Sequence, residues 1–469
     1  MTYQSPFSIR YGSKEMRILW SETAKRRVWR RVWLTVAEAQ SSAGLATPEQ
    51  IEDIRANVEN VDLVRAAEIE GEIGHDLMAE LKVYTEQCAV GGSILHWGLT
   101  SADVQDNADI LRQRTSIAIL TLKIKELLQV FAATIEKTSD NVIMGYTHLQ
   151  PAEPTTLGYR LSMYAEDLLG RYDALIRLRH NLRAKGVRGP VGTSAAFVEI
   201  LANSDVTAEE LEKQVMESLG LCAYPVSGQI YTRIQDFTLI AELSALAGSL
   251  SKFGFDLRMM QSPGLGDIAE PFSASQVGSS AMPFKKNPVN AEKICSLARL
   301  VAAGLPVAWQ NAANNLLEQT LDDSANRRRL IPESFLACDE MLLTAIKIMS
   351  ELIIDENASR EQLEKYGTFA SVARVLTALV EAGADRQTMH EHLRQQSMRA
   401  WDSVKSGNAN PLVETLASDT IILKYLQPAA IRGFLDTSTY VGLAPERARD
   451  TVARIQARFE TAQPEGNEA

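Results

Sequence analysis

The sequence predicts an all-α protein built around a bundle of long helices, and three observations support this fold class. Residues 102–144 contain no glycine and no proline, so nothing there should stop a helix, which can exceed about 30 residues. Alternating patterns typical of strands are scarce along the chain. Within residues 102–144 an apolar stripe recurs at steps of three or four, as on one face of a helix: Ile117, Leu120, Ile124, Leu127, Phe131 and Ile135.

Three further long helices are expected at residues 155–185, 235–261 and 289–317. In the last of them Gly304 and Pro306 should introduce a kink, because proline lacks an N–H donor and clashes with the preceding turn. Several helices of this length predict an elongated bundle. Such helices often carry more apolar surface than one subunit covers, which favours a homo-oligomer, although a monomeric bundle also fits the pattern.

Three irregular segments, 91–101, 145–156 and 261–288, are expected between the helices. Loops of this length inside compact domains usually have a function or are disordered. The third segment lies between two long predicted helices, which favours a function. The last residues, 463–469, read QPEGNEA and should be disordered because they are polar and contain almost nothing to bury.

The composition restricts the class of function. The chain has 469 residues, of which 45% are hydrophobic and 23% are charged, and its formal net charge is −11. These values are typical of globular proteins, and the acidic balance argues against nucleic-acid binding, which requires a basic face. We expect no membrane span, because no apolar run approaches about 18 residues. Residues 1–10 lack the apolar core of a signal peptide.

The cysteines support a reducing, cytoplasmic location. The chain has four, they lie far apart, and they form no C-x-x-C pair, so neither a zinc site nor a disulfide framework is predicted. Buried, reduced thiols are the simplest interpretation. The four are Cys88, Cys222, Cys295 and Cys338.

Only six histidines are available as general acids or bases near neutral pH. His390 and His392 lie in a charged helical stretch and are expected to be solvated or structural, and His180 lies among arginines and is expected at the surface. The other three lie near turns or breaks in the helical pattern, where a structural role and a catalytic role are both open. These are His75, His96 and His148.

The segment 278–288 (GSSAMPFKKNP) combines groups that could hold a carboxylate as it gains charge. Two serines and a glycine provide hydroxyls on a flexible backbone, and Lys285 and Asn287 add a cation and an amide donor. Pro288 should begin a helix, and free N–H groups at a helix start favour an anion. The alternative is a surface loop that ends in a capped helix.

A second polar cluster, 321–329 (LDDSANRRR), is expected to be a solvated helix start with an acidic first turn. Arg327 and Arg328 could instead bind phosphate or carboxylate, because the guanidinium fork fits these anions. Motifs for metal proteases, nucleotide hydrolysis and serine hydrolases are absent from the sequence: there is no Walker loop, G-x-G-x-x-G, H-E-x-x-H or G-x-S-x-G.

The segment GSSAMPFKKNP resembles the signature loop of the fumarase/aspartase superfamily. Further segments resemble the adenylosuccinate lyases, in particular their animal-type branch: IRYGSKEM, HWGLTSADVQDNAD, GYTHLQPAEPTT, SGQIYTR, LDDSANRR, DRQTMHEHLR and GLAPERA. The resemblance implies an all-helical subunit of three domains, at residues 1–101, 102–353 and 354–469. It also implies a homotetramer whose active sites combine segments from three subunits.

The resemblance implies a carbon–nitrogen lyase that releases fumarate from an N-succinyl adduct by anti β-elimination. The expected reaction converts adenylosuccinate to AMP and fumarate, with the related carboxamide step of purine synthesis. Ser279 matches the base that removes a proton from the carbon beside a carboxylate, and His148 matches the acid to the leaving nitrogen. Glu292 matches the carboxylate partner of that histidine. No metal or other cofactor is implied.

Other residues match groups that hold the substrate. Lys285 and Asn287 match the hold on the succinyl carboxylate, and His75 matches a second active-site histidine. Further succinyl or substrate contacts are implied for Thr100, Ser101, Thr147, Gln229 and Met282, and contacts to the nucleotide phosphate for Arg10, Tyr11, Ser324 and Arg328.

The chain departs from the adenylosuccinate lyases at three positions. Gly74 and Gln319 stand where these enzymes usually have arginine, and Lys293 stands where the animal-type branch has arginine. A charge-assisted hydrogen bond contributes about 1.5–3 kcal/mol, and lysine does not replace a bidentate arginine. The alternative is therefore a lyase for another, possibly unphosphorylated, N-substituted aspartate. A catalytically silent relative is the third hypothesis, and the presence of Ser279 and His148 argues against it.

Overall fold

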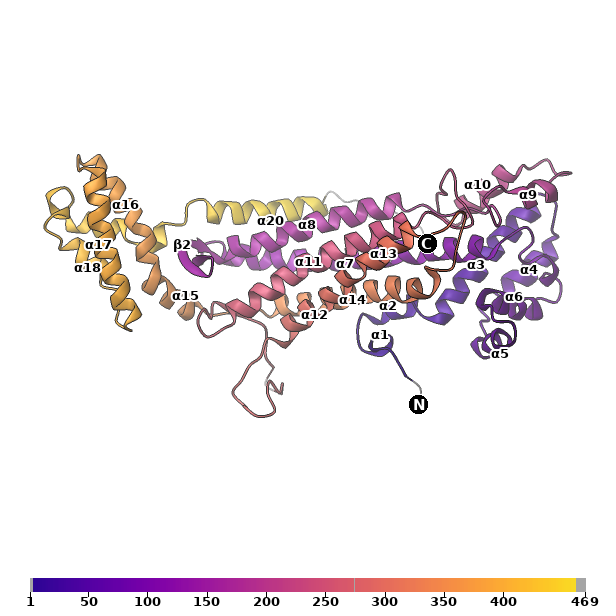
Figure 1. The fold of residues 1–469 in the computed structure, drawn as a ribbon, viewed down its shortest axis with the longest axis horizontal. Coiled ribbons are helices and arrows are strands. Elements are labelled where there is room, and N and C mark those ends of the chain that lie inside the picture. The colour runs from indigo at the N-terminus through magenta and orange to yellow at the C-terminus, as the bar shows by residue number, and fades with distance from the viewer. Residues whose placement is uncertain (1–2, 274, 461–469) are drawn as a thin grey trace.

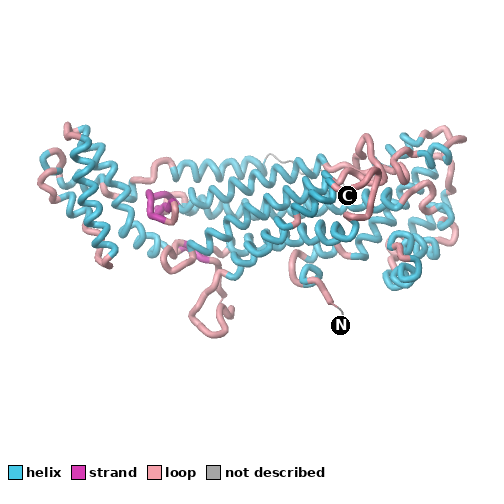
Figure 2. Tube along the Cα trace, in the orientation of Figure 1, coloured by secondary structure: helices cyan, strands magenta, loops and turns pink. Residues whose placement is uncertain are grey.

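The computed structural model describes residues 3–273 and 275–460, and its long helices lie side by side in an elongated bundle (Figure 1). Helices dominate along the whole length, as Figure 2 shows, which confirms the all-α prediction. The bundle consists of α7 (Ser101–Thr138), α8 (Leu157–Asn181), α11 (Ile234–Met260), α12 (Val289–Ala303), α13 (Leu305–Ala313) and α14 (Ser324–Ser350), joined by α20 (Ala444–Glu460).

Helix α7 begins at Ser101, one residue before the expected stretch, and has 38 residues, so it ends at Thr138 rather than near residue 144. Thr100 and Asp103 form a capping box at its start, with Asp103 Oδ2 accepting a hydrogen bond of 2.8 Å from the Thr100 N–H. All six residues of the predicted apolar stripe are fully buried, because α8, α14 and α20 pack around α7. The period of the apolar residues therefore identified the centre of the bundle correctly.

The break expected at Gly304 is present. Helix α12 ends at Ala303 and α13 begins at Leu305, with Pro306 in its first turn, where the missing N–H costs nothing. Helix α13 ends at Ala313 rather than at residue 317.

The segment 145–156 is ordered, and our prediction of an irregular segment is wrong there. Strands β1 (Val142–Thr147) and β2 (Gln150–Thr156) form an antiparallel hairpin with a shift of register between Met144 and Tyr146. Pro151 and Pro154 argue against a strand in the sequence, since proline cannot donate to a ladder. A hairpin of two strands tolerates them because each strand has a second edge that needs no pairing. The described residues of segment 261–288 are largely irregular, with a two-residue strand, β3 (Ile268–Ala269), paired to β4 (Ile353–Ile354).

Most of the N-terminal helices pack at one end of the bundle (Figure 1). They are α3 (Glu22–Ser42), α4 (Pro48–Ala56), α5 (Leu63–Ile73), α6 (Asp76–Gln87) and the 3-10 turn η1 (Gly92–Ile94). The short helices α1 (Pro6–Ile9) and α2 (Lys14–Leu19) lie nearer the middle, in contact with α14. Helices α9 (Ala195–Ile200) and α10 (Ala208–Ser218) lie at the same end. Glu80 of α6 is fully buried between two arginines of α3, 2.6 Å from Arg30 Nε and 3.0 Å from Arg26 Nη1.

We expect Glu80→Ala to lower the thermal unfolding temperature strongly, because it leaves two buried guanidinium groups without their carboxylate, at a cost of about 3–5 kcal/mol. Thermal unfolding followed by circular dichroism at one protein concentration measures the change. Glu86→Ala is the matched control on the same helix: its pair with Arg65 is exposed and should contribute at most about 1 kcal/mol. Equal losses for the two variants would contradict the expectation.

A separate lobe follows the bundle. It contains α15 (Glu356–Gln362), a π-helical turn η2 (Leu363–Gly367), α16 (Thr368–Glu381), α17 (Arg386–Lys405), α18 (Leu412–Ala417), η3 (Ile422–Lys424), α19 (Pro428–Phe434) and η4 (Thr437–Thr439). Its buried apolar residues, from Val375 to Leu435, form a cluster of their own. Helix α20 then returns to the bundle, where Ala448, Val452 and Ile455 join the main core.

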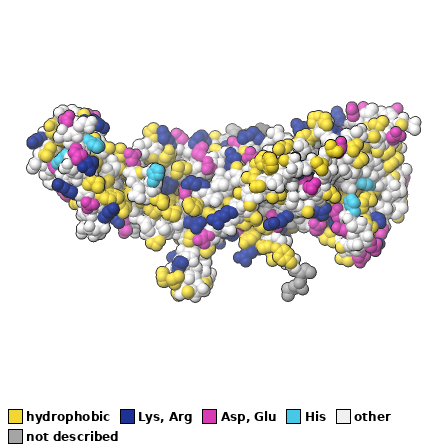
Figure 3. All heavy atoms as spheres, viewed as in Figure 1, with side chains coloured by type: hydrophobic (Ala, Val, Ile, Leu, Met, Phe, Trp, Pro, Cys, Tyr) yellow, Lys and Arg dark blue, Asp and Glu magenta, His cyan; other side chains and the backbone are white. Residues whose placement is uncertain are grey.

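The boundaries predicted at residues 101 and 353 stay predictions, and the tail at 463–469 lies outside the described residues. No helix within 3–273 and 275–460 is long and apolar enough to cross a membrane. Apolar side chains are exposed on several bundle helices and nearby segments, and Figure 3 shows hydrophobic atoms between the charged ones along the face in view. They include Leu122, Met163, Ile234, Phe255, Trp309, Leu316 and Leu317.

Candidate active site

Two helix starts bring His75 and Ser101 together at the N-terminal end of the bundle. His75 is the N-cap of α6, and its Nδ1 accepts a hydrogen bond of 3.4 Å from the Met78 N–H. Its Nε2 lies 3.4 Å from the Ser101 hydroxyl at the start of α7. Both side chains reach the surface, so a substrate could contact them directly.

Gln229 joins this group from the segment before α11. Its side-chain amide donates to the Thr100 hydroxyl over 3.4 Å, and its backbone N–H donates to the Glu318 carbonyl over 3.3 Å. The contact with Glu318 brings in the segment that leads to α14. Four of the predicted substrate contacts therefore meet in one place, although they come from three distant parts of the chain.

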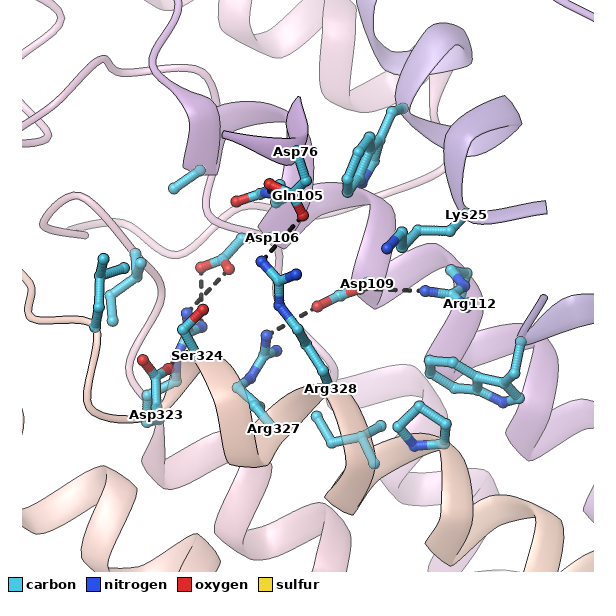
Figure 4. A pocket seen from close by; sticks show the side chains of 18 of the residues that line it. Lys25, Asp76, Gln105, Asp106, Asp109, Arg112, Asp323, Ser324, Arg327 and Arg328 are labelled. Carbon is cyan, nitrogen blue, oxygen red and sulfur yellow. Dashed lines mark hydrogen bonds and ion pairs between the residues drawn. The ribbon is translucent and has the colours of Figure 1, made fainter. Parts of the chain in front are cut away.

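A cavity of about 190 Å³ adjoins these residues, and Ser324 and Arg328 of α14 line it (Figure 4). The half-exposed Arg328 guanidinium lies 3.0 Å from the Asp76 carboxylate, which follows His75. The two expected phosphate contacts on α14 thus face the histidine-bearing helix start. An anionic ligand would compete with Asp76 for Arg328.

A buried network of ion pairs holds the start of α14 against α7 and α11. Arg327 lies 2.5 Å from Asp236 and 2.8 Å from Asp109. Burial alone would raise the pKa of Asp236, but the guanidinium of Arg327 and a second arginine hold that pKa below its usual value. The sequence left open whether Arg327 binds an anionic substrate group. Its guanidinium instead donates to three groups of the protein, so we assign it to holding the start of α14, which carries Arg328.

That second arginine, Arg233, connects the segment of Gln229 to the same network. It lies 2.9 Å from Asp106 and 2.6 Å from Asp323, which is the residue just before α14. The sequence did not identify Arg233 and its acidic partners as part of the site. A single charged residue on a helix gives no indication in the sequence that it is buried.

His148 lies at the other end of the bundle, in the turn of the β1–β2 hairpin (Figure 1). His148 and Leu149 both have positive φ, 53° and 58°. Two-residue hairpin turns need this geometry, but neither residue is a glycine, and each such residue costs about 1–2 kcal/mol. Thr147 and His148 are both exposed. Strain that keeps an imidazole at an exposed tip is typical of a functional position.

The segment 278–288 forms a loop that extends away from the bundle between α11 and α12 (Figure 1). The half-buried Ser279 hydroxyl accepts hydrogen bonds from the N–H groups of Ala281 and Met282, at 3.3 and 3.0 Å. Asn287 closes the loop by donating to the Gly278 carbonyl over 2.7 Å. A Cβ at Gly278 would lie 2.1 Å from the Lys285 carbonyl oxygen, so only glycine fits. Met282 and Lys285 are exposed.

The start of α12 differs from the prediction. Pro288 is the N-cap rather than the first helical residue. The N–H groups of Asn290 and Ala291, which we expected to be free for a substrate anion, already donate to the buried carboxylate of Glu270, at 2.9–3.1 Å. Glu270 carries no sequence signal, because it lies 20 residues before the helix that it caps. Glu292 is exposed in the first turn of α12.

Arg10 and Tyr11 lie after α1, near the middle of the bundle, with the Arg10 guanidinium 5.9 Å from the Tyr11 ring centre. The next N–H group, of Gly12, donates to Glu340, and Glu340 also pairs with Lys293 at 2.7 Å. Lys293, one of the three positions where the chain departs from the adenylosuccinate lyases, is therefore linked through Glu340 to the segment of the expected phosphate contacts Arg10 and Tyr11.

The other two departures lie at the N-terminal end of the bundle. Gly74 ends α5 with a φ of 69°, a conformation that favours glycine. The side-chain oxygen of Gln319 is buried in the lining of the cavity, and no hydrogen-bond partner was found for it among the described residues.

Of the remaining histidines, three lie where the sequence placed them, and the open role of His96 is decided by its contacts. His180 and His390 are exposed, and His392 pairs with Asp419 at 2.8 Å. His96 accepts a hydrogen bond of 3.0 Å from the Trp33 indole, and burial lowers its pKa, so it is a neutral structural residue.

One chain thus assembles only part of the predicted site. Ser324 and Arg328 line the cavity, and His75, Ser101 and Gln229 each directly precede a residue that lines it. Thr100 joins them through its contact with Gln229. The hairpin with His148, the loop with Ser279, and the Arg10–Tyr11 segment lie in separate places (Figure 1). The expected pair of Glu292 with His148 stays a prediction, since the two residues are on different elements of this chain.

Comparisons with known proteins identify the family of this chain. A family model described as "Lyase" matches residues 12–303, and a model described as "Adenylosuccinate lyase C-terminus" matches residues 369–451. Adenylosuccinate lyase of Saccharomyces cerevisiae is 35% identical over 460 residues, covering 96% of this chain and 94% of its own length. That of Archaeoglobus fulgidus is 34% identical over 449 residues, covering 95% and 97%.

Solved structures share the fold at low identity. The fumarate lyase from Mesorhizobium sp. BNC1 has a TM-score of 0.83 at 21% identity, covering 97% of this chain and 100% of its own. The 3-carboxy-cis,cis-muconate lactonizing enzyme from Pseudomonas putida has a TM-score of 0.85 at 23% identity, covering 97% and 99%. With relatives above 30% identity along nearly its whole length, the chain belongs to the adenylosuccinate lyase family of the fumarase/aspartase superfamily.

Proposed function

We propose that this protein cleaves adenylosuccinate to AMP and fumarate, and carries out the related carboxamide step of purine synthesis. The observation that carries the proposal is the meeting of His75, Ser101 and Gln229 beside a cavity lined by Ser324 and Arg328. Relatives named adenylosuccinate lyase extend over 96% of the chain. Such a site offers a hydroxyl and amide donors for a succinyl group and a guanidinium for a phosphate.

The proposed reaction is a β-elimination. Ser279, as its alkoxide, removes a proton from the succinyl carbon next to a carboxylate, and the electron pair passes into that carboxylate. The pair then forms the carbon–carbon double bond of fumarate while the carbon–nitrogen bond breaks, and His148 gives its proton to the leaving nitrogen. Stabilising the extra charge on the carboxylate is the main task, which we assign to Lys285 and Asn287.

The serine needs a special setting, because its hydroxyl is a poor base in water. Ser279 accepts two backbone N–H bonds, and such donors favour the alkoxide over the neutral hydroxyl. Closure of the exposed loop over substrate would remove water and bring Lys285 close. An anionic Glu292 beside His148 would favour the protonated imidazole that the leaving nitrogen needs.

We further propose a homotetramer with active sites shared between subunits. His148, Ser279 and the cavity lie on separate parts of one chain (Figure 1), so a complete site requires several chains. Exposed apolar side chains on α7, α8 and α11, such as Leu122, Met163 and Phe255, support such an assembly. All four cysteines are unpaired thiols, three of them buried as expected and Cys222 exposed against that expectation. Unpaired thiols fit a cytoplasmic location.

The second candidate is a lyase for a different, possibly unphosphorylated, N-substituted aspartate. The observation in its favour is the loss of cations around the phosphate position. Gly74 and Gln319 carry no charge, and the Lys293 ammonium is paired with Glu340. Retention of Arg10, Ser324 and Arg328 favours the nucleotide.

A fumarate-release assay distinguishes the two candidates. Purified protein is offered adenylosuccinate, its unphosphorylated form and a panel of N-substituted aspartates. We expect the highest kcat/KM for adenylosuccinate. Turnover of another aspartate without turnover of adenylosuccinate would reject the first proposal in favour of the second.

Arg328→Gln should raise the KM for adenylosuccinate by about tenfold to a hundredfold, because it removes a charge-assisted contact of about 1.5–3 kcal/mol. The KM for the unphosphorylated form should change little. Arg329→Gln is the control, since Arg329 is the next residue but is exposed and paired with Glu333 at 2.8 Å. Equal effects of Arg328→Gln on both substrates would remove Arg328 from the phosphate site.

A further inference from the structure

A buried arginine connects the hairpin of His148 to the root of the Ser279 loop. Arg160 lies in the first turn of α8 and is 9% exposed. Its Nη2 donates to the Met144 carbonyl of β1 over 2.6 Å, and its Nη1 donates to Asp267 Oδ2 over 2.9 Å. Asp267 is fully buried and directly precedes β3.

In the hairpin, Arg160 contacts the Met144 carbonyl next to a position where β1 can adopt few backbone conformations. The register of β1 shifts between Met144 and Tyr146. The residue between them, Gly145, cannot carry a side chain, because a Cβ there would lie 2.5 Å from the Glu153 carbonyl oxygen. The strand therefore has little freedom from Met144 to the tip, and fixing the Met144 carbonyl sets the direction in which His148 points.

In the loop, the residues next to Asp267 fix both ends of the segment that carries Ser279. Strand β3 pairs with β4, and Glu270, one residue after β3, binds the N–H groups at the start of α12. Residues 271–273 and 275–288 project from this closed root. A shift of Asp267 would thus move both ends of the loop that carries Ser279.

A second set of hydrogen bonds, through Gln362, also connects the hairpin to the segment that leads into the Ser279 loop. The Tyr146 hydroxyl donates to the Gln362 side-chain oxygen over 3.2 Å, and the Gln362 amide donates to the Gly264 carbonyl over 3.0 Å. Burial raises the pKa of Tyr146 to about 12, so its phenol remains a donor at neutral pH. Two independent connections at one junction indicate that the relative placement of hairpin and loop is specified.

We propose that Arg160 and Asp267 are positioning residues for the reaction, which together fix the orientation of the His148 hairpin and of the Ser279 loop. The inference rests on the proposed function for the roles of those two side chains. Neither Arg160 nor Asp267 touches the substrate. Each acts through the element that it holds, and a displacement of about 1 Å at either reacting group can lower the rate by about a hundredfold.

The kinetic test compares Arg160→Met with the double variant R160M/D267L. The single variant should lower kcat by about tenfold to a hundredfold and change KM by a smaller factor. The contacts at Arg328 and Gln229, at the other end of the bundle, stay in place, whereas those of Lys285 and Asn287 move with the loop. The double variant replaces a buried ion pair by apolar groups, which can restore stability. We expect it to recover the thermal unfolding temperature but not kcat.

A lysine at position 160 provides a further comparison. Arg160→Lys keeps the charge beside Asp267 but lacks the planar fork that reaches Met144 at the same time. It should keep most of the thermal stability and still lose kcat. Arg171→Met is the control, because Arg171 also joins α8 to α11, through Glu242 at 3.2 Å, away from the hairpin and the loop. It should leave kcat unchanged.

Hydrogen exchange gives a readout that needs no activity. Arg160→Met should speed amide exchange in both 142–156 and 264–288 of the ligand-free protein, and Arg171→Met should do so in neither. Wild-type kcat in R160M/D267L, or faster exchange in only one of the two segments, would overturn the inference. If exchange changes in both segments but the wild-type protein releases no fumarate, the proposed function fails while the structural link stands.

Discussion

Replacing Ser279 by alanine should lower kcat for fumarate release by at least about a hundredfold, the usual contribution of a general base. The variant loses the hydroxyl that accepts the N–H groups of Ala281 and Met282. KM should change little, since Ser279 acts on a proton rather than on a binding group. Steady-state kinetics of fumarate release measures both constants.

Ser280→Ala is the matched control for this experiment, because Ser280 is the adjacent hydroxyl in the same exposed loop. It should keep kcat within about threefold of the wild type, as expected for a surface substitution without a role in the reaction. Near-normal activity of Ser279→Ala, or an equal loss in Ser280→Ala, would refute the assignment of Ser279 as the base.

Mixing two inactive variants should restore activity. His148→Ala should lower kcat at least as much as Ser279→Ala, through loss of the acid. If each site takes His148 from one chain and Ser279 from another, random mixing of the two variants gives both intact groups to about a quarter of the sites. We therefore expect about a quarter of the wild-type activity after the two proteins are unfolded and refolded together.

The control for mixing is Ser279→Ala combined with Asn287→Ala. Both residues lie in one loop, closed by the bond from Asn287 to Gly278, so every site in the mixed protein lacks one of the two groups. No activity should return. If the first mixture forms mixed assemblies, detected by native mass spectrometry, and remains inactive, active sites shared between chains are excluded.

The parts of the fold that the sequence predicted are those determined by local pattern. The stripe from Ile117 to Ile135 identified α7, because burial of one helical face leaves a period in the sequence. Pro306 identified the break before α13, because its effect is confined to its own turn. The hairpin of β1 and β2 was missed, since Pro151 and Pro154 oppose a strand and only pairing with β1 reveals it.

The sequence predicted only those residues of the candidate site that lie in motifs resembling a known family. Ser279 and His148 lie in sequence motifs that are specific to a family. Arg160, Asp267 and Glu270 instead act through contacts with residues distant in the sequence. Glu270 shows the difference most clearly: its carboxylate occupies the helix start that appeared open to a substrate. No local pattern reports such a contact, because its cause is the tertiary fold.

Helix α20 has a consequence for the order in which the protein is made. It follows all other described elements in the chain, yet Ala448, Val452 and Ile455 cover the helices α7 and α8 made far earlier. A ribosome completes the whole lobe of residues 356–443 before that cover exists. During this interval the nascent chain displays an apolar stripe to water, a surface that favours aggregation. Synthesis of this protein should therefore depend on a chaperone that shields α7 and α8 until α20 emerges.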